Sequence, residues 1–152
     1  SMILLLQRVS RAAVRVSGAT VGEIGPGLLA FGCVEPGDGP DAMDEAARRT
    51  VELRVFEDAN GKMNLDVTQA GGAVLAVSQF TLGADLSRGR RPGFEGAARP
   101  EEARPLFDRY VASLRASGVK VATGAFGAMM EVELVNDGPA TFSWRTKRKD
   151  LV

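Results

Sequence analysis

The stretch MILLLQRVSRAAVRVSG, residues 2–18, decides the fold. Its first six residues, Met2–Gln7, are almost wholly apolar, and Val9–Val16 then mixes Arg and Ser with Val and Ala. A run of this kind, closed by the turn signal Ser17-Gly18, predicts one long or bulged β-strand. We therefore expect the chain to begin with this strand and the other elements to be arranged around it.

Outward from this strand, the chain alternates short apolar segments with turn signals and has two helical patterns. Helices are predicted from about Asp41, with Pro40 in the first turn, and from about Pro100 to Ser117, with Gly118 closing the end. Extended segments are predicted over Thr20–Ile24, Leu28–Val34, short pieces between Phe56 and Leu65, Ala73–Val77, Val119–Thr123, Met129–Val135 and Ala140–Trp144. The pattern predicts a single α+β domain with many strands, two main helices and one core.

The composition is that of one globular domain. The chain has 152 residues, 45% hydrophobic and 25% charged, and its 19 basic and 19 acidic residues cancel, so a globally basic nucleic-acid binder is not expected. No segment approaches the roughly 20 apolar residues of a membrane span, and no signal peptide is evident, so we expect a cytoplasmic protein. We assign the domain to residues 2–144, Ser1 to a cloning scar, and residues 145–152 to a charged tail that frays.

Two features of the composition limit the chemistry. The sequence has no histidine, which excludes Ser-His and Cys-His catalysis and any His-ligated metal. Its single cysteine, Cys33, lies in an apolar run and is expected to be a small buried hydrophobe. We therefore predict no metal site and no cofactor.

Three segments carry the candidate chemistry. Ser78–Leu82 follows an apolar strand, where polar side chains build a site or simply mark the exit of the strand into a loop. Asn136–Thr141 contains Gly138-Pro139 between extended segments, as a hairpin turn or as a specified cis-proline unit. A loop holds Arg88, Arg90 and Arg91, which favours either an anion site or a solvated surface.

Taken together, the motifs resemble the D-aminoacyl-tRNA deacylase family over Met2 to about Phe142. The matching stretches are Gln7–Val9, Gly22–Leu28, Leu53–Asp58 with Gly61–Asn64, Ser78–Leu82, Gly89–Pro92, and Asn136–Pro139 with Thr141. The resemblance implies a mixed, mostly antiparallel, barrel-like sheet with two helices in a homodimer. It also implies hydrolysis of the ester between a D-amino acid, or glycine misloaded on alanine tRNA, and the terminal adenosine of tRNA.

The resemblance also implies the site residues. Ser78, Gln79, Phe80 and Thr81 form the catalytic segment of one subunit. The Gly-Pro unit, cis in the family, enters the partner's pocket, where its carbonyls exclude the side chain of an L-residue. Five residues are assigned to substrate binding and chiral selection: Gly138, Pro139, Asn136, Met130 and Arg8. Three are assigned to binding of tRNA phosphate: Arg88, Arg90 and Arg91. Arg8 is either a brace for the Gly-Pro unit or a surface arginine of the strand.

The attacking group follows from the residue types. The backbone N–H groups of Phe80 and Thr81 can stabilise the oxyanion of ester hydrolysis. A threonine hydroxyl is a weak nucleophile without an adjacent base, and neither Ser78–Leu82 nor Gly138-Pro139 holds a carboxylate or a lysine. We therefore favour a bound water helped by the ribose 2′-hydroxyl, with Thr81 in a positioning role, over attack by Thr81 itself.

Two other functions are compatible with parts of the sequence. One is that of a paralogue that removes L-alanine from threonine tRNA, in which the Ser-Gln-Phe-Thr motif differs. The other is a non-catalytic nucleic-acid-binding module, which the arginine loop would serve equally well. The intact segment Ser78–Thr81 argues against both.

Overall fold

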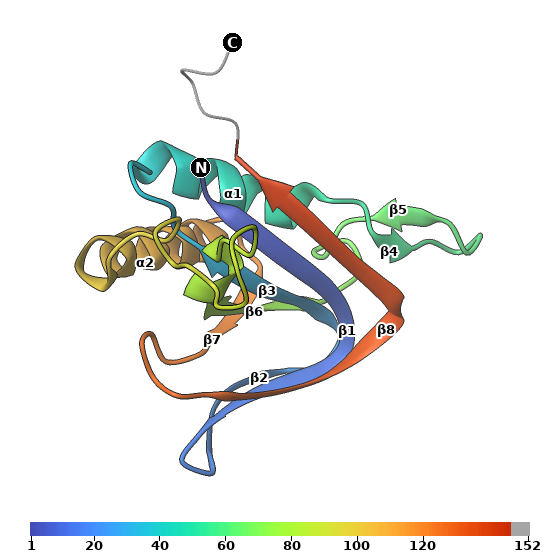
Figure 1. Ribbon diagram of the computed structural model, residues 1–152. Coiled ribbons are helices and arrows are strands. Elements are labelled where there is room, and N and C mark those ends of the chain that lie inside the picture. Colours follow the sequence, from blue (N-terminus) through green and yellow to red (C-terminus); the bar gives the residue numbers. More distant parts are fainter. Residues whose placement is uncertain (147–152) are drawn as a thin grey trace.

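The computed structural model describes residues 1–146, and Figure 1 shows its elements. Two long strands, β1 (Ile3–Val16) and β8 (Glu131–Arg145), run side by side across the molecule. The other elements in chain order are β2 (Ala19–Ile24), β3 (Gly27–Cys33), α1 (Pro40–Glu52), β4 (Phe56–Glu57), β5 (Met63–Leu65), β6 (Ala73–Ser78), a 3₁₀ turn (Phe80–Gly83), α2 (Pro100–Ala116) and β7 (Lys120–Thr123). No helix of the described part is long and apolar enough to cross a membrane.

Strand β1 contributes to two hydrophobic clusters, because the alternation of its buried and exposed side chains shifts in the middle of the strand. Leu4 and Leu6 pack into the cluster that includes the buried faces of both helices, whereas Val9, Ala12 and Val14 pack into a second cluster. In a regular strand, residues of one face differ by even numbers. The register of β1 with β8 shifts between Gln7 and Val9 and again before Arg11, and this irregularity produces the phase change.

The main sheet is mixed and mostly antiparallel. The strand order is β2-β1-β3-β6-β7, and β8 also pairs with β1. Strand β1 is antiparallel to β2, β3 and β8, whereas the pairs β3–β6 and β6–β7 are parallel. Parallel neighbours need a crossover connection, and α1 and α2 lie in these two connections. Both helices therefore lie on one side of the sheet, as Figure 1 shows.

The sheet curls until it is nearly closed, because a glycine lets two strands approach. A Cβ added to Gly22 of β2 would collide with the carbonyl oxygen of Thr123 at the end of β7. Only glycine allows this backbone approach. The α+β class and the barrel-like sheet with two helices that the sequence predicts are thereby confirmed.

The predicted elements agree with the structure except near the C-terminus. The sequence predicts Met129–Val135 and Ala140–Trp144 as two segments, but they belong to one strand, β8, whose pairing is interrupted between them. Arg145 still pairs with Ile3, and the buried Thr146 donates its N–H to the carbonyl of Met2. The folded part thus includes two residues that the sequence assigns to the tail, and residues 147–152 lie outside the described part.

An acidic residue of α1 joins the two helices. The carboxylate of Asp44 accepts two hydrogen bonds of 2.8 Å from Arg109 and one of 2.5 Å from Ser113, both on α2. The bonds from Arg109 and then from Ser113 lower the pKa of Asp44 to about 2. The pair is largely exposed, so the effect is screened by solvent.

The substitution Arg109→Ala should raise the pKa of Asp44 toward its ordinary value of about 3.9. Because the folded carboxylate has the lower pKa, its contribution to stability is present above this value and disappears as the pH falls to about 2. NMR titration and urea unfolding at several pH values would measure both effects. The control Arg48→Ala, which removes only the ion pair with Glu52, should leave the titration of Asp44 unchanged.

Candidate active site

The segment Ser78–Thr81 connects the end of β6 to an exposed 3₁₀ turn. Ser78 is the last residue of the strand, and the N–H of Gln79 continues the ladder with a 2.8 Å bond to the carbonyl of Gly32. Phe80 and Thr81 open the 3₁₀ turn, and the first N–H groups of a helical turn have no acceptor within it. These two amides can therefore donate to a bound anion.

The hydroxyl of Thr81 lies beside an amide and not beside a base. The side-chain Nε2 of Gln79 donates a hydrogen bond to Thr81 Oγ1. An amide N–H cannot accept the hydroxyl proton. The arrangement orients the hydroxyl of Thr81 without activating it as a nucleophile.

Cys33 packs against the 3₁₀ turn. Its Sγ lies 3.5 Å from the carbonyl oxygen of Phe80, and the residue is buried, as the sequence predicts. Burial, and next the negative charge of Glu35, raise the pKa of this thiol. Cys33 is therefore an uncharged packing residue under the candidate catalytic segment.

Ser78 also lines a cavity of about 430 Å³ between β6, the end of β7 and α2. Its wall on α2 is a stripe of residues three and four apart: Arg104, Phe107, Asp108, Val111, Ala112 and Arg115. The opposite wall includes Gly124 and Phe126. A Cβ added to Gly124 would lie 2.8 Å from Sδ of Met130, which packs against the hydrophobic cluster of Val14 and Val77 and does not line this cavity.

The segment Asp137–Ala140 is looped out of the ladder between β8 and β1. Asn136 pairs with Val9 and Thr141 pairs with Gln7, so these four residues stand opposite Arg8 alone. The peptide bond between Gly138 and Pro139 is cis, and both residues are exposed. The structure thus has a specified bulge here rather than the hairpin turn that local signals allowed.

The side chain of Asn136 holds the two ends of this bulge together. Its Oδ1 accepts the N–H of Ala140 at 2.7 Å, and its Nδ2 donates to the carbonyl of Ala140 at 3.2 Å. The same Nδ2 lies 3.1 Å from the hydroxyl of Thr141. One amide side chain therefore replaces the backbone pairing that the bulge has lost.

Arg8 is buried and contacts the bulge from behind. Its Nε donates to the carbonyl of Asp137 at 3.0 Å, and its Nη1 donates to the carbonyl of Val55 at 2.8 Å. The residue is only 6% exposed, so it is not a surface arginine of the strand. It connects the Gly138-Pro139 segment to the start of the β4–β5 hairpin.

The structure separates the predicted residues into two groups. Ser78, Gln79, Phe80 and Thr81 lie at the end of β6, whereas Asn136, Gly138 and Pro139 lie on β8, with Arg8 opposite them on β1. Met130 packs against the cluster that includes Val77 of β6. The strands β1 and β3 stand between β6 and β8. In a flat sheet, Ser78 and the Gly138-Pro139 bulge would be three strand spacings apart, about 14 Å, and four residues apart along the strands, about 13 Å.

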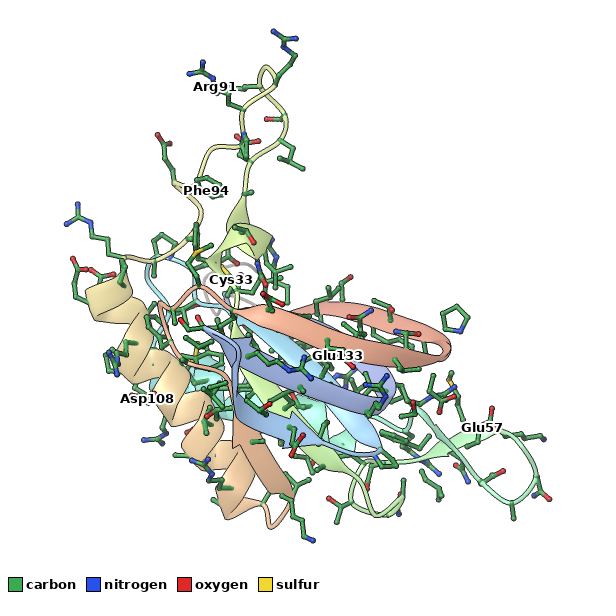
Figure 2. All side chains as sticks on the ribbon, turned by 90° about the horizontal axis from the view of Figure 1, so that it is seen from below. Cys33, Glu57, Arg91, Phe94, Asp108 and Glu133 are labelled. Carbon is green, nitrogen blue, oxygen red and sulfur yellow. The ribbon has the colours of Figure 1, made fainter. Side chains whose placement is uncertain are left out.

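The three predicted phosphate-binding arginines lie on a loop that extends from the body. Asp85 and Gly93 exchange backbone bonds of 2.7 and 2.9 Å at the base of this loop, and every residue from 86 to 92 is exposed. Figure 2 shows Arg91 near the tip and Phe94 between the tip and the body. The ring of Phe94 contacts that of Phe80 at 5.3 Å, so the loop lies directly beside the candidate catalytic segment.

The sequence did not identify the residues of α2 and Phe126 as part of a site. The spacing of the α2 stripe predicts its apolar members, which form the core, whereas the charged residues beside them carry no local signal of a ligand. A cavity between a helix and the end of a neighbouring strand depends on tertiary packing, which a single sequence does not reveal.

Comparison with known proteins gives concordant matches. A model of the family described as D-Tyr-tRNA(Tyr) deacylase matches residues 5–145. A protein of Shewanella sp. (strain MR-4), named D-aminoacyl-tRNA deacylase, is 56% identical over 142 residues, which cover 93% of this chain and 98% of the relative. The solved structure of a "c-Myc DNA Unwinding Element Binding Protein" has a TM-score of 0.90 at 32% identity, with 96% of this chain and 99% of that one covered. That of a "probable eukaryotic D-amino acid tRNA deacylase", with a TM-score of 0.83 at 17% identity over 95% and 99% of the two chains, agrees in fold.

The bulge should tolerate no side chain at Gly138. Its φ is +143°, and an added Cβ would lie 2.9 Å from the backbone nitrogen of Ala140 and 3.1 Å from Nη2 of Arg8. We expect Gly138→Ala to lower the free energy of unfolding by about 1–3 kcal/mol. The control Gly89→Ala has a positive φ but open space around it, so it should cost less; equal losses in urea titrations would contradict the steric argument.

Proposed function

The chain belongs to the D-Tyr-tRNA(Tyr) deacylase family and is a hydrolase of the D-aminoacyl-tRNA ester, and on this premise we propose that two copies of it build each active site together. In this proposal, one subunit supplies Ser78–Thr81 and the partner subunit supplies the Gly-Pro bulge. The enzyme acts on charged tRNA in the cytoplasm and removes D-amino acids, and glycine misloaded on alanine tRNA.

The observation that carries the proposal is the separation of the two motifs. Both are exposed, but β1 and β3 stand between them in one chain, so they cannot contact the same α-carbon. A second copy related by a twofold axis would bring each bulge to the other's catalytic segment, and would do so twice. Partly exposed apolar side chains of Ile3, Leu5 and Phe31 offer a surface for such an association.

In this proposal, the backbone carbonyls of the bulge form a wall that selects the chirality of the substrate. A bulge held by Asn136 and Arg8 presents carbonyl groups at a constant place, whatever side chain the substrate carries. Such a wall rejects any group that projects from the α-carbon on the L side, so one device serves every D-amino acid. Glycine has no side chain to reject and is accepted.

Hydrolysis uses the exposed 3₁₀ turn. The N–H groups of Phe80 and Thr81 stabilise the oxyanion as it develops, and such donors are worth about 10²–10³ in rate each. A bound water attacks the ester carbon with help from the ribose 2′-hydroxyl, and the ester oxygen leaves as the 3′-hydroxyl of the ribose. The hydroxyl of Thr81, oriented by Gln79, positions the water or the substrate.

The cavity beside Ser78 takes the terminal adenosine of the tRNA. Its 430 Å³ is in the size range of small-molecule sites, and the ring of Phe126 on its wall offers a stacking surface for a base. The nucleoside would then lie on one side of the catalytic segment and the partner's bulge on the other. The arginine loop extends from the same segment and contacts phosphates of the tRNA body.

A non-catalytic nucleic-acid-binding role is the second candidate. It is favoured by the loop that holds Arg88, Arg90 and Arg91, and by the structural neighbour at 32% identity, which is named as a DNA-element binding protein. Release of free amino acid from D-aminoacyl-tRNA by the purified protein would contradict a purely non-catalytic role, and binding without release would support it.

Complementation between two inactive variants tests the shared site. Thr81→Trp blocks the catalytic segment of its own subunit, and Pro139→Trp blocks the pocket of its partner. After mixing and subunit exchange, half of the dimers should carry both variants and one intact site, which restores about a quarter of wild-type activity. A mixture of two differently tagged Thr81→Trp chains should stay inactive, and mixtures no more active than this control would refute a site shared between subunits.

The substitution Thr81→Ala should retain substantial activity. Loss of a positioning hydrogen bond is worth about 0.5–1.5 kcal/mol, or roughly a tenfold lower rate. Single-turnover rates on D-aminoacyl-tRNA would measure it, and Thr81→Ser should restore most of the rate. A ten-thousandfold loss, or an acyl-threonine species detected by mass spectrometry, would assign the attack to Thr81 instead.

Replacing Arg88, Arg90 and Arg91 together with Ala should weaken tRNA binding and reduce its salt dependence. Each lost phosphate contact should lower the slope of log K against log [salt] by about 0.7–0.9. The preference for D over L esters should not change, because the loop lies outside the pocket. Filter binding at several salt concentrations would measure the slope, and an unchanged slope would leave the loop as solvated surface.

A further inference from the structure

The cavity next to Ser78 continues as a groove along one face of α2, with a guanidinium at each end. Arg104 and Arg115 both line it, and they are eleven residues apart, which is about 16 Å along a helix. Asp108 lines the wall between them and is labelled on α2 in Figure 2. A nucleoside in the part next to Ser78 would leave the rest of this length unfilled.

Both arginines lack an acidic partner. Within residues 1–146, neither Arg104 nor Arg115 forms an ion pair. By contrast, Arg109 of the same helix pairs with Asp44, and Arg48 of α1 pairs with Glu52. The guanidinium carbon of Arg104 lies 5.9 Å from the centre of the Phe126 ring. This contact leaves the hydrogen-bonding edge of the guanidinium available for an anion.

The order of the elements decides which arginine is close to the reacting ester. Strand β6 runs parallel to β7, and Ala76 pairs with Thr123, so Ser78 lies beyond the end of β7 where residues 124–126 begin. Through its contact with Phe126, Arg104 lies at this end of the groove. Arg115 is three helical turns farther away, toward the start of β7.

Resting on the proposed function, we propose that this groove binds the phosphodiester backbone of the tRNA 3′ end. Arg104 contacts the phosphate on the 5′ side of the terminal nucleoside, and Arg115 contacts a phosphate farther from the ester. Arginine matches the geometry of phosphate oxygens and keeps its charge at any physiological pH. Asp108 repels phosphate from the middle of the groove, so the two contacts lie at its ends.

A series of D-phenylalanyl esters that differ only in phosphate content tests this assignment. The series is the 3′-ester of adenosine, that of adenosine 5′-monophosphate, and that of the trinucleotide CCA. Arg104→Ala should lower kcat/KM on the monophosphate ester about tenfold more than on the adenosine ester. Arg115→Ala should lower kcat/KM on the trinucleotide ester about tenfold more than on either smaller ester.

Arg109→Ala is the matched control, because this arginine lies on the same helix but is bound to Asp44. It should behave like the wild type on all three esters. Equal losses for Arg104→Ala on the adenosine and monophosphate esters, or no loss on the monophosphate ester, would overturn the phosphate subsite alone. A wild-type protein inactive on every ester would contradict the proposed function and this subsite together.

Discussion

The buried guanidinium of Arg8 is the constraint on which the rest of the site depends. A buried charge is costly unless it is paired and hydrogen-bonded, and Arg8 donates to two backbone carbonyls, of Asp137 and Val55, and lies 3.7 Å from the carboxylate of Asp137. The carbonyl of Asp137 reaches it because β8 leaves the ladder at this point. The interrupted pairing, the phase change of β1 and the exposed Gly138-Pro139 segment are therefore parts of one arrangement.

This arrangement also bears on the proposed association of two copies. The bulge lies on β8, which β1 and β3 separate from β6, so its carbonyls lie away from the candidate catalytic segment of their own chain. Its conformation is nevertheless fixed within the chain by Asn136 and Arg8. In the proposed dimer, a wall that is rigid before association would need no ordering when it enters the partner's pocket, and this would reduce the entropy cost of forming the shared site.

Much of the fold could be predicted because its signals are local. Pro40 and Pro100 begin helices where first-turn prolines belong, and Cys33 is buried in its apolar strand. The candidate site divides differently. The segments Ser78–Thr81 and Asn136–Pro139 could be found from their motifs, but the role of Gly22 in closing the sheet depends on its distance from Thr123 in space. The groove on α2 was missed for the same reason, since its second wall comes from residues 124–126.

The neutral net charge conceals an uneven use of arginine. Several arginines are engaged by acceptors in the protein: Arg11 and Arg15 by Glu133, Arg48 by Glu52, Arg109 by Asp44, and Arg8 by backbone carbonyls. Within the described residues, the loop with Arg88, Arg90 and Arg91 and the groove with Arg104 and Arg115 form no ion pairs. Both flank the candidate catalytic segment Ser78–Thr81. The field of an unpaired cation extends about 8–10 Å at physiological salt. A local concentration of such cations would attract a polyanion to the candidate site although the whole protein is neutral.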